Sequence, residues 1–496
     1  MTKIRDFCER VLKVIIAFGL VFALPQVTYA AEERLLEEII VTGTKREASA
    51  QDIPIALTAI SDEQLRSTFR TDIMALTDMA PSVVIGQMAG FRAITGGIRG
   101  TGQNSILVTQ DASVVLLLDE LGMSNVQAQF VELFDVEQIE IYRGPQGTLF
   151  GKSSTGGAIS ITTKRPVMNE FSADMSLQYG TFDGDDVPDT AAIKKYRASV
   201  NLPLTDTLAL RIAGIWDEDD GYYSNSKSDS SQYNGLIAAF GAPLPEWANG
   251  PSVGGGENLG GTDVFAAKVK LLWQPTDNYE AYFIYSHLDD DSDSVPAVQE
   301  SEDSMLVPLF GFPPNRDNLL ETGSSNACWG EAFCVQNGHQ VDVEQYQLHQ
   351  TYTMDNLTWK LIWAHREMAE ILPSSYAGEA FLSIFDASRN TSKDTDQLEL
   401  RVSSTFDGPF NFVAGVSRVE EETAMLAYAT VGLLSFMNFV DPDPNSGDGG
   451  SVFSVLGGAA DGIPLLNADG TLALETDYIT DPTMTGATQE RTTTAA

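Results

Sequence analysis

The feature that most constrains this chain is a series of segments after Pro166 in which apolar and polar residues alternate. Residues 171–180, FSADMSLQYG, carry apolar side chains at every odd position and mainly polar ones between them. Residues 196–204, 264–275 and 356–365 repeat the pattern, with aromatic residues near the segment ends. A period of two over about ten residues predicts strands that present one face to lipid and the other to a polar lumen.

The connections between these segments alternate in length. Short connections at 202–208, 274–278, 354–356 and 406–410 separate long ones at 217–262, 289–342, 369–393 and 420–487. Outer-membrane barrels have short periplasmic turns and long external loops, whereas a soluble sandwich has no reason for this regularity. We therefore predict a transmembrane β-barrel with about nine strands in this chain, the last beginning near Ala414. The ending, TQERTTTAA at 488–496, is predicted not to be a strand.

The charge balance excludes one class of partner. The chain carries 69 acidic residues against 30 Lys and Arg, and the net charge of −39 argues against nucleic acid. Acidic residues cluster in the long connections, at 217–220, 289–291 and 441–450. Two interpretations of these clusters stay open: a solvated surface, or a site for a cation or a basic ligand.

The N-terminus has the form of an export signal. A basic start is followed by the apolar run 14–24, too short to span a bilayer comfortably, and by small residues up to Ala30. We expect residues 1–30 to be a signal peptide, and the alternative is a retained N-terminal anchor. In an exported chain, Cys328 and Cys334 are close enough in sequence to form a local disulfide, with a metal pair beside His339 as the other interpretation.

Residues 50–166 have the composition of a compact, Gly-rich α/β domain. Ser61 predicts the N-cap of a short helix, and residues 71–79 predict a second helix that stops before Pro81. Two apolar runs, 114–120 and 136–144, predict strands of the same domain.

The last part of this domain, RGPQGTLFGKSSTGGAISITTKRP at 143–166, invites comparison with a phosphate-binding P-loop because it contains Gly151-Lys152-Ser153. However, Gln146 stands where the first glycine of that motif belongs, and the residues after Ser153 predict a strand instead of a helix. We therefore interpret the glycines as residues of tight turns, and Lys152 as a solvated or lumenal charge.

Taken together, these features resemble the TonB-dependent outer-membrane receptors. The resemblance rests on EEIIVTGTK at 37–45, on Ile98-Arg99-Gly100, and on the stretch from Ile139 to Pro166, followed by alternating strands. It implies a membrane β-barrel, 22-stranded in the family and partial in this chain, with an N-terminal α/β plug domain inside the lumen. Residues 31–49 would then hold the TonB-box segment, 50–166 the plug, and 167–496 the N-terminal part of the barrel with long extracellular loops.

An isolated partial barrel would leave two unpaired strand edges in lipid, which is energetically prohibitive. From the strand number we therefore expect the chain to be a fragment of a longer receptor or a truncated, non-functional one.

The resemblance also implies binding residues near the mature N-terminus. The segment that would add as a strand to the energising protein TonB comprises Glu38, Ile39, Ile40, Val41 and Thr42. In this mode of recognition, backbone hydrogen bonds provide the affinity and few side chains are dictated. The alternative is that these residues form an ordinary first strand of the plug.

Contacts between plug and barrel form the second implied group. In the family, plug arginines pair with barrel glutamates, so Arg99 and Arg143 are candidates on the plug and Glu399 on the barrel. Solvated lumenal charges are the plainer interpretation. The plug motif itself is marked by glycines and one proline: Gly100, Gly144, Pro145, Gly147, Gly151, Gly156 and Gly157.

The implied function is TonB-dependent active uptake of a nutrient across the outer membrane, with a ferric siderophore or another iron complex as the commonest cargo. A passive porin-like channel is the alternative, but it should lack both the plug and the TonB segment. No Ser-His-Asp, zinc-ligand or P-loop pattern indicates an enzyme, and no cofactor is expected. The four histidines, His287, His339, His349 and His365, are too scattered to nominate a metal site. The expected partners are TonB, outer-membrane lipid and a small-molecule or metal-complex substrate.

Overall fold

The computed structural model describes residues 40–41, 45, 48–51, 53–68, 72–87, 94–103, 111–123, 131–184, 187, 191–225, 258–293, 321–322, 327–329, 333–335, 338–375, 386–408, 410–430 and 483–495. The expected signal peptide and much of the long connections lie outside these ranges. Within them, none of the helices has the length and apolar character needed to cross a membrane.

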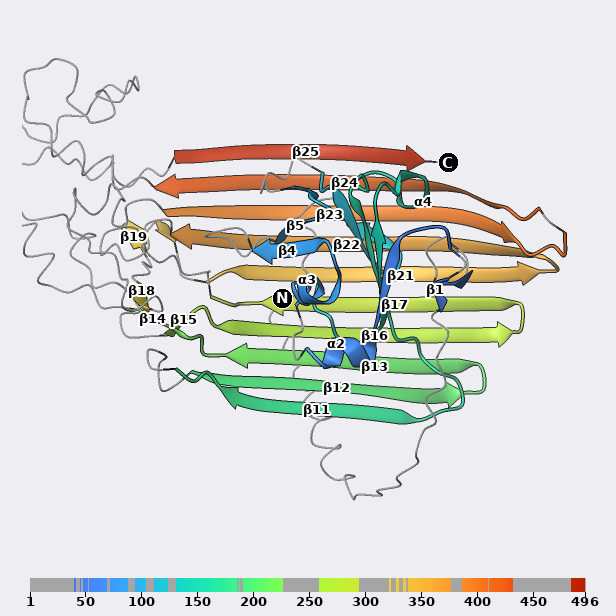
Figure 1. The fold of residues 1–496 in the computed structure, drawn as a ribbon, viewed down its shortest axis with the longest axis horizontal. Helices are drawn as coiled ribbons and strands as arrows, with labels where there is room; N and C mark the ends of the chain where they lie inside the picture. Colours follow the sequence, from blue (N-terminus) through green and yellow to red (C-terminus); the bar gives the residue numbers. More distant parts are fainter. Residues whose placement is uncertain are drawn as a thin grey trace, which may run out of the picture.

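A ten-stranded antiparallel sheet dominates the fold (Figure 1). Each strand pairs with the next in sequence order: β11 (Ser172–Thr181), β12 (Ala192–Thr205), β13 (Leu208–Asp219), β16 (Thr262–Thr276), β17 (Tyr279–Asp290), β21 (Gln340–Met354), β22 (Leu357–Ser375), β23 (Asp386–Ser404), β24 (Val413–Thr430) and β25 (Thr483–Ala495). The edges of the sheet are β11 and β25, so the barrel wall is open in the described chain. The alternating segments predicted as strands are confirmed.

The prediction that the ending is not a strand is wrong. Residues 483–495 form β25, which pairs with β24 from Ala429↔Thr483 to Ser417↔Ala495. The sequence carries no apolar period there, but Thr has a high strand propensity and β24 offers a long edge of backbone donors and acceptors. Residues 483–495 therefore form a strand because they pair with the edge of β24, and not because of their side-chain pattern.

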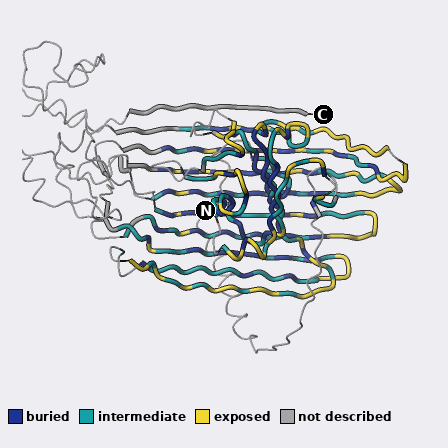
Figure 2. Tube along the Cα trace, viewed as in Figure 1, coloured by how far each residue is buried: buried dark blue, intermediate teal, exposed yellow. Residues whose placement is uncertain are grey.

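The sheet has one exposed apolar face and one covered face. On β22, Trp359 and Trp363 are 40% and 41% exposed, whereas Ile362 and Ala364, on the opposite face, are fully buried. Figure 2 shows the buried stretches of these strands gathered where the N-terminal domain lies against the sheet. Alternation thus puts the aromatic residues on the lipid side and a mixed polar surface on the side that holds the domain.

The N-terminal domain contains a five-stranded sheet and a smaller three-stranded one. The five strands lie in the order β3 (Leu57–Ser61), β9 (Val136–Arg143), β10 (Gly157–Thr163), β7 (Val114–Leu118) and β8 (Leu121–Met123). The second sheet comprises β4 (Val83–Gln87), β5 (Ile94–Ile98) and β6 (Thr101–Gln103). A shared core of aliphatic side chains, including Ile139, Ile141 and Leu116, joins these sheets to the two short helices.

The helices follow the sequence signals in part. Ser61 caps α2 (Asp62–Arg66) in a capping box with Gln64, as predicted. The helix α3 (Ala75–Met79) is shorter than the predicted 71–79, because Asp72 instead forms a β-bridge with Glu132. A third helix, α4 (Gly147–Phe150), is a single turn.

Small strand pairs complete the fold. Near the N-terminus, β1 (Ile40–Val41) pairs with β2 (Ala48–Ser49). Beyond the large sheet, β14 (Tyr223–Asn225) pairs with β15 (Asn258–Leu259) and β18 (Glu321–Thr322). The hairpin of β19 (Ala327–Trp329) and β20 (Phe333–Val335) places Cys328 opposite Cys334. Their side chains lie outside the described part of the structure, so the disulfide stays a prediction.

Candidate functional site where the N-terminal domain meets the sheet

The turn between β7 and β8 is one point at which the domain is held on the sheet. Its two central residues, Asp119 and Glu120, have φ angles of 48° and 72°. Positive φ at both positions is what a type I′ hairpin turn requires, although Asn and Gly fill it more often. The turn projects the carboxylate of Glu120 between Lys360 of β22 and Arg401 of β23, with the Arg401 Nη2 at 2.7 Å.

Amide side chains of the sheet bind the backbone of the same hairpin. Gln397 donates from Nε2 to the Glu120 carbonyl at 3.1 Å and accepts at Oε1 from the Gly122 N–H at 3.2 Å. Gln347 of β21 donates to the Leu118 carbonyl at 3.1 Å. Because Gln347, Lys360 and Gln397 stand on successive strands, the hairpin contacts the sheet over a width of three strands.

Asp119 ties the turn back to its own domain. Its carboxylate accepts from the N–H of Thr163 at 2.8 Å and from the Thr163 hydroxyl at 2.7 Å. The two acidic residues therefore have opposite tasks: Asp119 fixes the turn to β10, and Glu120 fixes it to the sheet. Carboxylates bound by charged donors and backbone N–H groups form the stronger class of hydrogen bonds.

Asp135, immediately before β9, forms a second attachment. Its φ is 54°, and its carboxylate is 2.5 Å from Arg211 Nη2 on β13 and 2.7 Å from Lys270 Nζ on β16. Lys270 also donates to the Lys164 carbonyl at 2.8 Å, and Lys268 donates to the Phe134 carbonyl at 3.1 Å. The side chains of Asp135 and Lys270 are 2% and 0% exposed, so this is a buried ion pair.

The surrounding cations keep both carboxylates ionised. Burial by itself would raise the pKa of Glu120, but Lys360 and Arg401, with Lys45 further off, hold it well below its usual value. Burial opposes ionisation of Asp135 as well, and Lys270 and Arg211 lower the pKa of Asp135 in spite of it. Opposite charges at close range favour the charged form of a carboxyl group.

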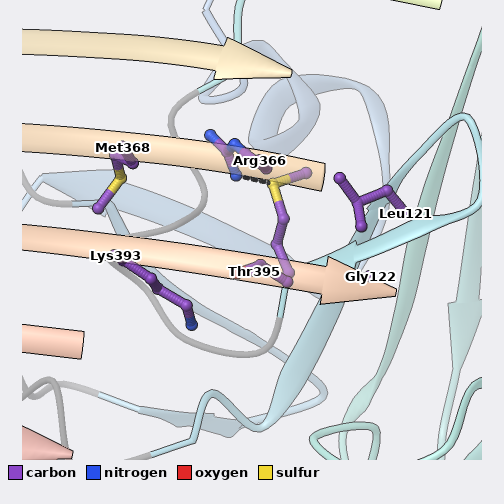
Figure 3. Close-up of a pocket in the computed structure, with 7 residues that line it drawn as sticks. Leu121, Gly122, Arg366, Met368, Lys393 and Thr395 are labelled. Atoms are coloured by element: carbon purple, nitrogen blue, oxygen red, sulfur yellow. Dashed lines mark hydrogen bonds between the residues drawn. The ribbon is translucent and has the colours of Figure 1, made fainter. Parts of the chain in front are cut away.

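A third attachment has the reverse polarity. Lys152, on the loop after α4, contacts the carboxylate of Glu421 on β24, and Lys393 Nζ lies 2.6 Å from the other oxygen of the same group. Beside it, Leu121, Gly122 and Met123 face Arg366, Met368, Lys393 and Thr395 around a cavity of about 10 Å³ (Figure 3). The Arg366 guanidinium contacts the Met123 sulfur, and the cavity has room for about one water.

The expected pairing of Arg99 or Arg143 with Glu399 does not form among the described contacts. Arg143 donates to the Thr58 hydroxyl within its own domain, and Arg99 is exposed. Glu399 lies 3.1 Å from Arg401 on its own strand, and Arg401 in turn contacts Glu120. The family's polarity does occur at other residues, since Arg165 contacts Glu280 on β17 and Lys152 contacts Glu421, whereas at Glu120 and Asp135 the domain supplies the carboxylate.

Lys152 is a lumenal charge, as interpreted from the sequence, and the P-loop comparison fails structurally. The helix α4 has four residues, and β10 follows it where a P-loop would have a long helix. Gly157 instead serves close packing, since a Cβ at this position would lie 2.2 Å from the Tyr142 carbonyl. The motif residues Gly144, Pro145, Gly147, Gly151 and Gly156 form the turn that joins β9 to β10, and Gly100 lies in the turn between β5 and β6.

The candidate TonB-binding segment is only partly described. Ile40 and Val41 form β1, and Val41 is fully buried, while Glu38, Ile39 and Thr42 lie outside the described residues. In the described chain β1 pairs with β2 and is separate from the five-stranded sheet. Lys45, with φ of 61°, places its ammonium 5.4 Å from the ring centre of Phe150, so the segment folds back on α4.

The histidines make pairwise contacts. His339 lies 3.1 Å from Asp290, and His365 lies 3.0 Å from both Glu367 and Asp396. Across the described ranges, His, Cys, Asp and Glu nowhere gather in threes in an arrangement that could hold a metal ion.

Comparisons with known proteins agree with this architecture. The family described as TonB-dependent Receptor Plug Domain matches residues 49–158. The chain is 29% identical over 220 residues to the pesticin receptor of Yersinia enterocolitica, covering 43% of this chain and 30% of that protein. It is 28% identical over 213 residues to the iron-regulated outer membrane virulence protein of Vibrio cholerae, covering 40% and 31%.

Solved structures give the fold over more of the chain. The ferric yersiniabactin uptake receptor FyuA of Yersinia pestis superposes with a TM-score of 0.57 at 19% identity, over 77% of this chain and 51% of that one. The unliganded ferric citrate transporter FecA gives 0.56 at 13% identity, over 80% and 52%. The chain thus spans about half the length of these structures, and less of the curated relatives. Residues 49–158 are similar to the plug domain of TonB-dependent receptors, and the chain has the fold of that plug together with part of a receptor barrel.

Proposed function

We propose that the chain serves TonB-dependent active uptake of a small molecule across the outer membrane, with an iron complex as the cargo. The observation that carries the proposal is the mode of attachment of the plug. Ion pairs and side-chain amide contacts at Glu120, Asp135 and Lys152 hold a folded domain against the lumenal face of the sheet. A passive channel has no use for a domain fastened across its lumen.

The attachments suit a gate that opens and closes again. Charged groups that separate from one another in a lumen can be rehydrated, whereas an apolar interface would stay closed or collapse. Asp135 and Lys152 occupy turns, and Glu120 sits in a hairpin, so each can move without unravelling a helix. A pull on the N-terminal segment therefore has discrete contacts to break before the plug rearranges.

The segment around Val41 is the proposed handle. Val41 is buried and its strand pairs with β2, so it must leave this pairing before it can add to a strand of TonB. Strand addition depends on backbone N–H and C=O groups, and proline removes a donor and fixes φ. Residues 38–42 are accordingly the place where a backbone change should act and a conservative side-chain change should not.

The cargo class is supported by the relatives. Their names include a ferric yersiniabactin uptake receptor, a ferric citrate transporter and an iron-regulated protein, and also a vitamin B12 transporter of Vibrio vulnificus. Iron complexes are the commonest among them, and we extend that class to this chain.

The test is uptake of radioactive iron complexes by a strain whose own copy of this gene is replaced by variants. Val41→Pro should abolish accumulation, and Val41→Thr, which keeps the backbone donor and the branched shape, should retain it. Deletion of the TonB gene should match Val41→Pro. Accumulation that persists in the TonB deletion would establish a passive channel and overturn the proposal.

A further inference from the structure

A row of carboxylates crosses the lipid-side face of the sheet. Glu344 pairs with Glu367, Glu367 with Asp394, and Asp394 with Glu422, on the neighbouring strands β21, β22, β23 and β24. Glu367 is four residues from Trp363 on one strand, so the row stands on the same face as the exposed aromatic residues. We refer to Glu344, Glu367, Asp394 and Glu422 as the carboxylate row.

The carboxylate row lies beside the end of the apolar band. Four register positions nearer the short turns, Leu348 pairs with Trp363 and Trp363 with Leu398. Trp363 and Leu398 are 41% and 48% exposed, which places both side chains on the outer surface of the sheet. An apolar band flanked by aromatic residues marks the hydrocarbon layer of a barrel. The carboxylate row therefore stands at the level of the lipid headgroups.

The negative charge of the row is only partly compensated. Like charges directly opposite one another destabilise a sheet, because their Cβ atoms are only about 4.5–5.5 Å apart. Between the row and the apolar band, His365 is 3.0 Å from both Asp396 and Glu367 and offsets part of the charge. Among the described residues, however, Asp394 and Glu422 form no ion pair.

A buried imidazole extends the same row. His287 on β17 pairs directly with Glu344, and its ring packs against Phe265 at a centroid distance of 6.3 Å. The residue is 6% exposed, and neither ring nitrogen has a hydrogen-bond partner in the described structure. A polar group that is buried without a partner is unfavourable, and an ordered water or ion beside it is one way in which native proteins satisfy such a group. It is an observation independent of the acidic residues beside it.

We propose that the carboxylate row binds divalent cations that it shares with phosphate groups of the surrounding lipid headgroups. Calcium and magnesium prefer oxygen ligands, and carboxylates on neighbouring strands can supply two of them. No three described His, Asp or Glu side chains converge as a ready-made metal site, so lipid phosphate and water complete the coordination. The cation removes the repulsion within the row and fastens the barrel wall to the headgroup layer. This inference does not depend on the transport proposal.

The experiment measures calcium binding by the full chain, with the binding of protein-free lipid or detergent subtracted. One preparation is vesicles of lipid A in phosphatidylethanolamine, which both carry phosphate, and the other is micelles of dodecyl maltoside, which carries none. The variant E367Q/D394N removes the two central charges of the row. The control E218Q/D263N removes another directly opposed pair on the same face, in which Glu218 is 2.9 Å from Lys194 and Asp263 accepts from Trp216.

We expect the wild type and E218Q/D263N to bind calcium in lipid A vesicles with the same affinity. E367Q/D394N should bind about tenfold more weakly, since the affinity of such sites follows the number of charged ligands. Without calcium, E367Q/D394N should melt at a higher temperature than the wild type because the repulsion is gone. The single variant D394N gives the same comparison with a smaller change to the fold.

Two results would overturn the proposal. If E367Q/D394N and D394N bind calcium in lipid A vesicles as tightly as the wild type, the row holds no cation. If wild-type binding is equally tight in dodecyl maltoside micelles, lipid phosphate is not part of the site.

Discussion

The carboxylate of Asp135 lies 2.7 Å from the ammonium of Lys270, and both side chains are almost completely withdrawn from solvent. Asp135 belongs to the plug and Lys270 to the barrel wall, so this ion pair attaches the plug to the wall. Arg211 reinforces it at 2.5 Å. At this pair the plug supplies the acid, whereas at Arg165–Glu280 and Lys152–Glu421 it supplies the cation.

Replacing Asp135 by Asn should loosen the plug. Asn tolerates the left-handed backbone at this position, but the change leaves Arg211 and Lys270 buried without a counter-charge. We expect a loss of about 3–5 kcal/mol in the free energy of unfolding of the plug, measured by urea denaturation in detergent. Asp174→Asn, which breaks an exposed pair with Arg66, is the control and should cost less than about 1 kcal/mol. Equal effects of the two variants would show that burial of the Asp135 pair is irrelevant.

Attachment at the β7–β8 turn should weaken in acid. The folded pKa of Glu120 is depressed, so its contribution to stability is complete above the usual value of 4.5 and disappears as the pH falls through the folded pKa. The protection of the β8 amides against hydrogen exchange, taken relative to the intrinsic exchange rate at each pH, should therefore fall below about pH 4.5 in the wild type. In Glu120→Gln, this protection should be lower at neutral pH and should change little with acid. Glu399→Gln leaves Glu120 with both of its cations and should behave nearly as the wild type. An identical acid response in Glu120→Gln would assign the effect to another group.

Gly157→Ala should destabilise the plug severely. The added Cβ would meet the Tyr142 carbonyl at 2.2 Å and the Ile98 side chain at 2.7 Å, and both neighbours belong to packed strands. Overpacking of this kind typically costs about 1–3 kcal/mol, and the contact with backbone places this site at the upper end. Gly86→Ala meets no atom within 4 Å and is the matched control. In thermal unfolding, Gly157→Ala should melt at a lower temperature than Gly86→Ala. Similar melting temperatures of the two variants would contradict the packing argument.

The two cysteines should form a disulfide in the exported chain. Cys328 and Cys334 stand directly opposite each other in the β19–β20 hairpin, a separation that a disulfide can bridge. Mass spectrometry of the alkylated chain without reductant should show neither thiol modified, and both modified after reduction. Alkylation of both residues before reduction would favour the alternative of a metal pair.

Much of this protein is legible in the residue pattern, because alternation and connection length follow from how a strand meets lipid. The odd-numbered side chains of β22, from Leu357 to Trp363, mark a lipid-facing side by their residue types alone. The N-cap at Ser61 and the failure of the P-loop comparison at Gln146 rest on equally local rules. The inward lysines of β16, Lys268 and Lys270, are a visible signal of cations on the lumenal face.

What the pattern could not supply is the identity of the partners. Arg99, Arg143 and Glu399 are the residues whose types match the polarity known for the family. In the structure the plug residues that bind the cations of the sheet are instead Glu120 and Asp135. Glu120 reaches them from a turn with positive φ, and Asp135 from the residue before β9. Likewise β25 has no readable period, and only the edge of β24 determines it.

The sequence by itself determined the two domains and the lipid-facing side of most strands, because each depends on periodicity or on short motifs along the chain. The tertiary structure alone decided which charges meet across the lumen and which carboxylates face one another on the lipid side. Those pairings join residues as much as 281 positions apart, as Glu120 and Arg401 are. Strand register and domain docking set such distances, and neither is encoded in any local stretch of residues.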